Sequence, residues 1–184
     1  EFKEEMKRAF LMSDLGLLSF YLGIEVRQDA EGITLQQAHY AKKILEMTCM
    51  ADCKAAATLM EERLRLSRDS TTEEVDTTLY RHIVGSLRYL IHTRPDLTYA
   101  VGYVSRFFER PTKEHFQGMK KILRYIAGTL QYGLRYGQRT GMTRLVGYCD
   151  SDLAGDIDTR KSTTSVLFFL RNCLVSWQSL KQRL

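Results

Sequence analysis

Residues 77–92 read TTLYRHIVGSLRYLIH, and this stretch decides the fold of the 184-residue chain. Its apolar side chains recur at steps of four, four and three: Leu79, Ile83, Leu87 and Leu90. That spacing places them on one face of an α-helix. The pattern therefore predicts an amphipathic helix that buries this stripe against neighbouring helices.

Three further helices are predicted around it. The first covers residues 38–47; Pro95 opens the second, at a first-turn position where its missing N–H costs nothing. Thr112 is expected to cap the third and Gly128 to end it, while the polar residues 61–76 are expected to form a loop. The side chains predicted to face the core are Ala41, Ile44, Leu45, Val101, Val104, Phe108, Phe116, Met119, Leu123 and Ile126.

Strand patterns lie on both sides of the helical region. Residues 20–26 and 33–35 are predicted as two strands of a hairpin whose turn contains Gly32, a residue free to take a positive φ. Four strands are predicted after the helices: 133–136, 145–150, 165–170 and 173–177. The last two form a hairpin turned at residues 171–172. The sequence predicts an α+β fold with a domain boundary near residues 136–142.

Composition narrows the class of protein. Hydrophobic residues make up 44% of the chain and charged residues 27%, the balance of a soluble globular protein. The longest apolar stretches are far shorter than the roughly 20 residues that cross a membrane. Residues 1–10 alternate in charge where a secretion signal would be apolar. We therefore expect an intracellular protein, in the cytoplasm or the nucleus, that is not secreted and has no membrane partner.

The net charge of +5 has a local origin. Between residues 112 and 136 the only acid is Glu114. The basic residues in this region are Lys113, Lys120, Lys121, Arg124 and Arg135. Such a patch suits nucleic-acid phosphates, although a solvated helix face explains it equally well.

Eight short motifs occur along the chain. They are MSDLG at 12–16, LGIEV at 22–26, YRHIVGSLRYL at 80–90, TRPDL at 93–97, KILRYIAGT at 121–129, GLRY at 133–136, GYCDSD at 147–152 and DTRKST at 158–163. In these motifs and in their order, the chain resembles copia-type retrotransposon Pol polyproteins over nearly its whole length. Each match is modest alone, and their common order makes the resemblance specific.

The resemblance implies the C-terminal part of a reverse transcriptase followed by the start of an RNase H domain. It assigns residues 1–37 to the end of the palm with a primer-grip-like hairpin, residues 38–136 to a helical thumb and connection, and residues 143–184 to the N-terminal part of a truncated RNase H-like domain. The implied fold is α+β, with a palm-derived β-hairpin, a helical thumb/connection bundle and a partial RNase H-like mixed sheet. We expect an internal piece whose partners include the remainder of the Pol polyprotein.

The resemblance also implies a nucleic-acid surface. Residues 20–26 stand where polymerases grip the primer, with an ordinary hairpin packed on helices as the alternative. Gly85 and Tyr89 share one helix face at i, i+4 spacing, where close helix packing is the competing reason for the glycine. The residues expected to contact an RNA–DNA or DNA duplex (primer–template) are Phe20, Tyr21, Gly23, Arg81, Gly85, Arg88, Tyr89, Lys120, Lys121 and Arg124.

The catalytic groups of the family are incomplete here. No adjacent Asp pair occurs in the chain, whereas the family's polymerase motif uses one to hold two metal ions. By resemblance, Asp150 matches the first RNase H carboxylate, an orphan catalytic and metal-binding residue without its partners. No cofactor is therefore expected in this fragment, whereas the parent enzyme uses Mg²⁺. The nearby acids do not fit an EF-hand loop and are expected in a polar connection between strands: Asp152, Asp156 and Asp158.

These features predict a fragment that lacks polymerase or RNase H activity alone and serves to hold a primer–template duplex. The alternative is an inactive retroelement relic with no biochemical activity of its own. The relic is favoured by departures from the family pattern, at Leu59, Leu153, Ser165 and Leu180. Of these, Ser165 matters most if the glycine expected there needs a positive φ.

Overall fold

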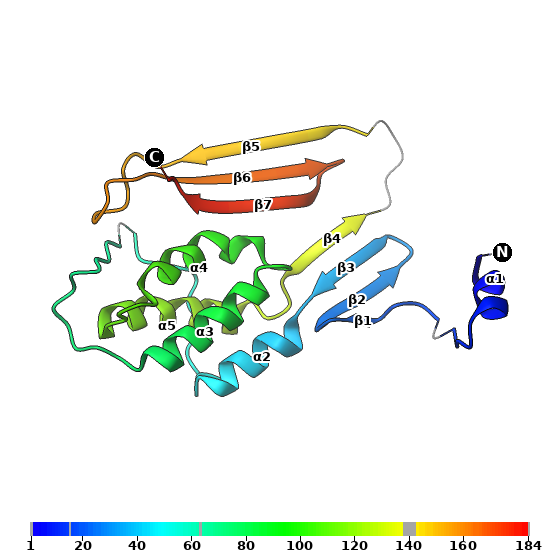
Figure 1. Cartoon of the computed structure of the whole chain (residues 1–184), viewed down its shortest axis with the longest axis horizontal. Coiled ribbons are helices and arrows are strands. Elements are labelled where there is room, and N and C mark those ends of the chain that lie inside the picture. The colour runs from blue at the N-terminus through cyan, green and yellow to red at the C-terminus, as the bar shows by residue number, and fades with distance from the viewer. Residues whose placement is uncertain (1, 15, 63, 138–142, 184) are drawn as a thin grey trace.

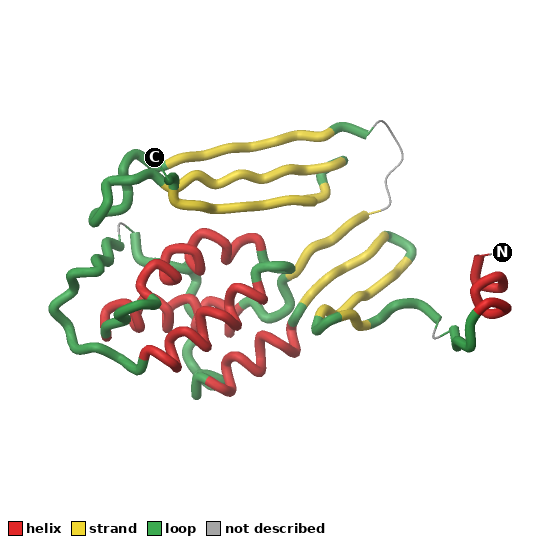
Figure 2. Tube along the Cα trace, in the orientation of Figure 1, coloured by secondary structure: helices red, strands yellow, loops and turns green. Residues whose placement is uncertain are grey.

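The computed structural model describes residues 2–14, 16–62, 64–137 and 143–183. It confirms the predicted α+β class, with a helical layer and two antiparallel sheets (Figure 1; Figure 2). The helices are α1 (Phe2–Ala9), α2 (Ala38–Met47), α3 (Thr77–Leu90), α4 (Thr98–Val104) and α5 (Lys113–Gly128), with 3-10 turns at Pro95–Leu97 and Ser105–Phe107. The strands are β1 (Phe20–Tyr21), β2 (Ile24–Asp29), β3 (Gly32–Gln36), β4 (Gly133–Gly137), β5 (Leu145–Ser151), β6 (Thr163–Leu170) and β7 (Cys173–Lys181). Among the described helices, none is long and apolar enough to cross a membrane.

Helices α2–α5 share one hydrophobic core, as their apolar faces predict. Two predicted core positions are wrong. Leu79 is exposed, because Tyr80 takes the inward place at the start of α3 and donates its hydroxyl to the Val104 carbonyl at 2.9 Å. Phe108 is also exposed and Phe107 is buried instead. The 3-10 turn after α4 has three residues per turn, so the inward phase moves from Phe108 to Phe107.

The first sheet has the strand order β1-β2-β3-β4. Residues 20–26 do not form one strand, because Leu22 and Gly23 take φ values of 48° and 80° and reverse the chain between β1 and β2. The β2–β3 hairpin is present, but its turn is shorter than predicted: β2 runs to Asp29, β3 begins at Gly32, and residues 30–31 form the turn. A Cβ on Gly32 would lie 2.1 Å from the Tyr136 carbonyl oxygen on β4, so only glycine fits there. The sequence predicted β4 but not its pairing with β3.

The second sheet has the order β5-β6-β7, and its described strands are all antiparallel, so the predicted mixed sheet is wrong. The strands follow one another without the crossover that parallel pairing requires. The β6–β7 turn falls at Arg171 and Asn172, both with positive φ, as predicted. Ser165 lies in extended β6 and does not have a positive φ. The predicted boundary at 136–142 falls largely outside the described residues.

His115 fastens the start of α5 to the 61–76 loop. Its Nδ1 accepts the Thr112 backbone N–H at 3.0 Å, and Nε2 lies 2.9 Å from the Ser67 carbonyl, to which a neutral ring donates. The ring stacks on Phe107 with centroids 4.0 Å apart. Burial lowers the pKa of His115 below its usual 6.5. The fold therefore favours the neutral imidazole, because a proton on Nδ1 would remove the acceptor for Thr112.

Acid is expected to loosen this cap. A histidine whose pKa is lowered by folding contributes stability that is complete above 6.5 and is lost as the pH falls toward the folded-state value. The midpoint of urea unfolding, measured between about pH 7 and pH 5, should fall on acidification in the native chain. His115→Asn should flatten that dependence. The control His82→Gln changes an exposed histidine and should leave it intact; a flat native profile would contradict the prediction.

Candidate nucleic-acid interface

Tyr89 joins helix α3 to the β1–β2 hairpin. Its hydroxyl donates a hydrogen bond to the Leu22 carbonyl. Its hydroxyl oxygen lies 3.4 Å from the position that a Cβ on Gly23 would occupy. Tyr40 of α2 packs edge-to-face on the Tyr89 ring with centroids 5.1 Å apart. The structure therefore brings two predicted positions together. The positive φ of Gly23 favours glycine, while the Tyr89 ring lies at an ordinary contact distance from a Cβ placed there.

The surface around this junction carries exposed aromatic and glycine positions. Phe20 and Tyr21 on β1 are 56% and 58% exposed. Gly85 is exposed one turn before Tyr89, and no atom lies within 4 Å of a Cβ placed on it. Helix packing within the described chain therefore does not explain the glycine. A mid-helix glycine costs about 1 kcal/mol relative to alanine.

The two predicted arginines of α3 differ in their surroundings. Arg81 donates from Nε to the Phe108 carbonyl at 2.9 Å, and its guanidinium lies 5.9 Å from the centre of the Phe108 ring. Arg88 is exposed, and no hydrogen-bond or ion-pair partner is found for it among the described residues. Arg88 is thus the arginine of this helix that is available to an anion.

The basic patch is largely paired within the molecule. Lys121 forms an ion pair with Glu61, and Arg124 donates from Nε to the Lys54 carbonyl at 2.7 Å. Lys120 lies over the Phe116 ring at 5.1 Å. Arg135 sits on β4, where it pairs with Glu31 at 2.7 Å. The partners of Lys121, Arg124 and Arg135 lie far away in the sequence, so the local count of charges overstated the free positive charge.

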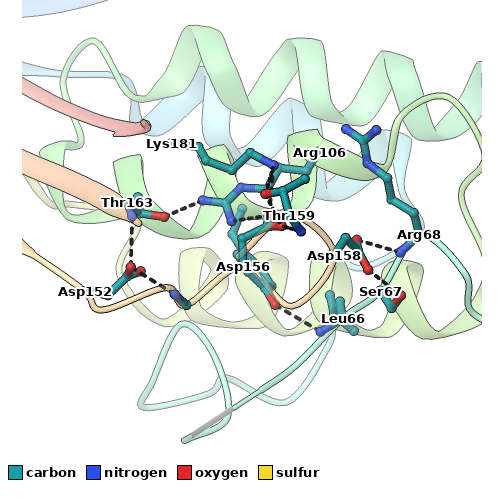
Figure 3. A network of polar contacts seen from close by, with 12 residues as sticks. Leu66, Ser67, Arg68, Arg106, Asp152, Asp156, Asp158, Thr159, Thr163 and Lys181 are labelled. Carbon is teal, nitrogen blue, oxygen red and sulfur yellow. Dashed lines mark hydrogen bonds and ion pairs between the residues drawn. The ribbon is translucent and has the colours of Figure 1, made fainter. Parts of the chain in front are cut away.

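Asp152, Asp156 and Asp158 lie in the polar connection between β5 and β6, as predicted (Figure 3). Asp152 accepts the backbone N–H of Thr163 at 2.9 Å. Asp158 accepts from the Ser67 hydroxyl at 2.6 Å and from the Arg68 N–H at 3.0 Å, across to the helical part. Asp150 is exposed on β5. In the described parts of the chain, no three His, Cys, Asp or Glu side chains are grouped to hold a metal ion.

Asp156 lies at the centre of an ion cluster that sequence reasoning missed. It pairs with Arg106 at 3.2 Å and with Lys181 at 3.0 Å. Burial alone would raise the pKa of Asp156, but hydrogen bonds from Thr159 and the Lys181 ammonium outweigh burial and lower it to about 2. The three charges come from the 3-10 turn that follows α4, from the β5–β6 connection and from β7 (Figure 3). No spacing in the sequence links them, because the pairs span 50 and 25 residues.

Comparison with known proteins adds independent information. A family model described as reverse transcriptase (RNA-dependent DNA polymerase) matches residues 1–62. The chain is 38% identical to an uncharacterized mitochondrial protein of Arabidopsis thaliana, over 97% of this chain and 73% of that protein. It is 39% identical to the retrovirus-related Pol polyprotein from transposon RE1 of Arabidopsis thaliana, and 39% identical to that from transposon TNT 1-94 of Nicotiana tabacum.

These polyproteins are far longer than the chain. Both alignments cover 98% of this chain, but only 12% of the RE1 polyprotein and 14% of the TNT 1-94 polyprotein. No solved structure matches the chain.

Proposed function

The chain belongs to the copia-type retrotransposon Pol polyprotein family, and from that premise we propose that it holds a primer–template duplex for a reverse transcriptase without catalysing a reaction itself. The observation that carries the proposal is the contact of Tyr89 with Leu22 and Gly23. Through it, the hairpin and the exposed face of α3 form one continuous surface. We assign the hairpin to the palm, the helices to the thumb and connection, and β5–β7 to the start of an RNase H-like domain.

The chemistry of this surface suits a duplex of any sequence. Exposed aromatic rings at Phe20 and Tyr21 offer stacking surfaces, and the unpartnered Arg88 offers charge to a phosphate. Gly85 allows a sugar–phosphate backbone to approach the helix, since no described side chain covers it. Contacts with the backbone carry no sequence information. A polymerase must move along any template, so this kind of contact fits the role.

The family's chemistry implies a divalent metal, and the described residues do not fit one. Asp150 offers a single exposed carboxylate. Asp152 and Asp156 are already engaged, by backbone N–H groups and by the Arg106–Lys181 pair respectively. Metal pairs in nucleotidyl transfer need several converging carboxylates. We therefore derive no catalytic step for this chain.

Duplex holding is tested by a salt titration of binding to an RNA–DNA hybrid. The affinity should fall steeply as salt rises, because released counterions drive phosphate binding. Tyr89→Ala should weaken binding by about tenfold. Circular dichroism establishes that the chain is folded. If the folded chain does not bind the hybrid, the proposal fails and the inactive-relic alternative stands.

Gly85→Ala separates folding from binding. Because the position is open, alanine should raise the free energy of unfolding by about 1 kcal/mol. The added methyl group should at the same time keep the duplex backbone away and weaken hybrid binding by about tenfold. Urea unfolding and fluorescence anisotropy measure the two effects. Gln117→Ala, at an exposed position of α5, is the matched control and should leave affinity unchanged. Unaltered affinity in Gly85→Ala would rule out the glycine contact.

A further inference from the structure

A cavity of about 540 Å³ opens between the helical layer and β7. Its walls come from the C-terminal end of α3, from α4 and from β7, which lie side by side in Figure 1. Its volume lies within the roughly 300–1,000 Å³ of small-molecule sites. The cavity lies outside the hairpin, and it shares Arg88 with the proposed duplex surface.

Two sets of contacts connect the walls of the cavity and fix the distance between them. On one side, the Trp177 indole N–H donates to the Ile91 carbonyl at 3.1 Å. On the other side, the pairs formed by Asp156 with Arg106 and Lys181 tie β7 to the 3-10 turn that follows α4. The cavity is therefore formed before any ligand arrives, which lowers the entropic cost of binding.

The lining combines apolar and cationic side chains. Ile91, Val101 and Trp177 supply apolar and aromatic surface. Among the described residues, no Asp or Glu lines the cavity, whereas Arg88, Arg106 and Lys181 do. Arg106 and Lys181 share the single charge of Asp156, so one positive charge remains there, in addition to that of Arg88. The balance favours an anion.

We propose that the cavity binds a nucleotide. The base lies against the apolar residues beside Trp177, and the phosphate binds to Arg88. A planar base suits an aromatic wall because it stacks or packs on it with little loss of freedom. A guanidinium binds phosphate through two parallel hydrogen bonds. Either a free nucleotide or the phosphorylated end of a strand supplies this chemistry.

Trp177 is the only tryptophan of the chain and reports directly on the cavity. Titration of the full chain with AMP and with UMP should change its fluorescence, and calorimetry should give the same Kd. Arg88→Gln should weaken binding by about tenfold. Arg27→Gln, which removes an exposed charge on β2, is the matched control and should have no effect.

The outcomes distinguish a free nucleotide from a strand end, and they distinguish this proposal from duplex holding. A 5′-phosphorylated oligonucleotide that binds more tightly than AMP identifies a strand end, and the reverse identifies a free nucleotide. The site is disproved if AMP and UMP give neither a fluorescence change nor heat at about 10 mM, if inorganic phosphate binds as tightly as AMP, or if Arg88→Gln leaves the Kd unchanged. Gly85→Ala changes a residue outside the cavity lining and should leave the Kd for AMP unchanged, so failure here is distinct from failure of duplex holding.

Discussion

Arg94→Ala is expected to lower the free energy of unfolding by about 3 kcal/mol, more than any change at an exposed charge. Its guanidinium is 2% exposed and makes a two-pronged contact with Asp96 at 2.9 and 2.7 Å. It also donates to the carbonyl and hydroxyl of Thr129, at 2.9 and 2.8 Å, which ties the start of α4 to the end of α5. The rings of Tyr125 and Tyr132 both lie within 6 Å of it.

The loss of stability comes from unpaired hydrogen-bond acceptors and lost packing more than from the unpaired charge of Asp96. Asp96 is 32% exposed, so water takes over part of its solvation. Arg94→Lys should recover less than half of the loss, because an ammonium does not reproduce the planar fork. Urea unfolding followed by circular dichroism measures both. Arg110→Ala is the control: its pair with Glu74 is more than half exposed, so it should cost below about 1 kcal/mol. Equal losses for Arg94 and Arg110 would refute this account.

Asp156→Ala is expected to release the β5–β7 sheet from the helices at a cost of about 3–5 kcal/mol. Without the carboxylate, Arg106 and Lys181 face each other as like charges, with the Arg106 side chain only 11% exposed. Trp177 should then become accessible to water, since its contact with Ile91 depends on the docked sheet. A red shift of its emission, while helical circular dichroism is retained, would record the release.

Acid should reproduce this release in the native chain. An aspartate whose pKa is lowered to about 2 contributes stability that is complete above its ordinary value of 3.8 and is lost as the pH falls through about 2. Emission of Trp177 should therefore shift between about pH 4 and pH 2. Asp158→Asn is the control. Because Asp158 is exposed, this substitution should lower the free energy of unfolding by less than about 1 kcal/mol. A sheet that stays docked in Asp156→Ala would show that Trp177 and apolar contacts suffice.

The helices could be read from the sequence because their pattern is local. The stripe in residues 77–92, the cap at Thr112 and the proline at position 95 act within one or two turns. The structure has the helix with every stripe residue but Leu79 buried, the capped start of α5, and at Pro95 a 3-10 turn that leads into α4. Errors arose where two neighbouring residues competed for one inward place. Tyr80 is buried in place of Leu79 and donates to the Val104 carbonyl, and Phe107 is buried in place of Phe108 because a 3-10 turn changes the helical phase.

The candidate interface could be predicted only in part. The sequence and its resemblance singled out Gly85, Tyr89 and the 20–26 segment. They did not place Tyr89 on Leu22 and Gly23, a contact across 67 residues. They also counted Lys121 and Arg124 as free, because the partners of these residues are distant in the sequence. The Glu61 carboxylate lies 60 residues from Lys121, and the Lys54 carbonyl lies 70 residues from Arg124.

The sequence by itself determined the family, the α+β class, the position of most helices and the β6–β7 turn. Each of these depends on spacing and turn chemistry among near neighbours. Only the tertiary structure decided the partner of β4, the contact of Tyr89 with the hairpin, and the cluster of Asp156 with Arg106 and Lys181. These depend on which distant groups meet once the core has formed, and burial makes such pairs strong without leaving a local pattern.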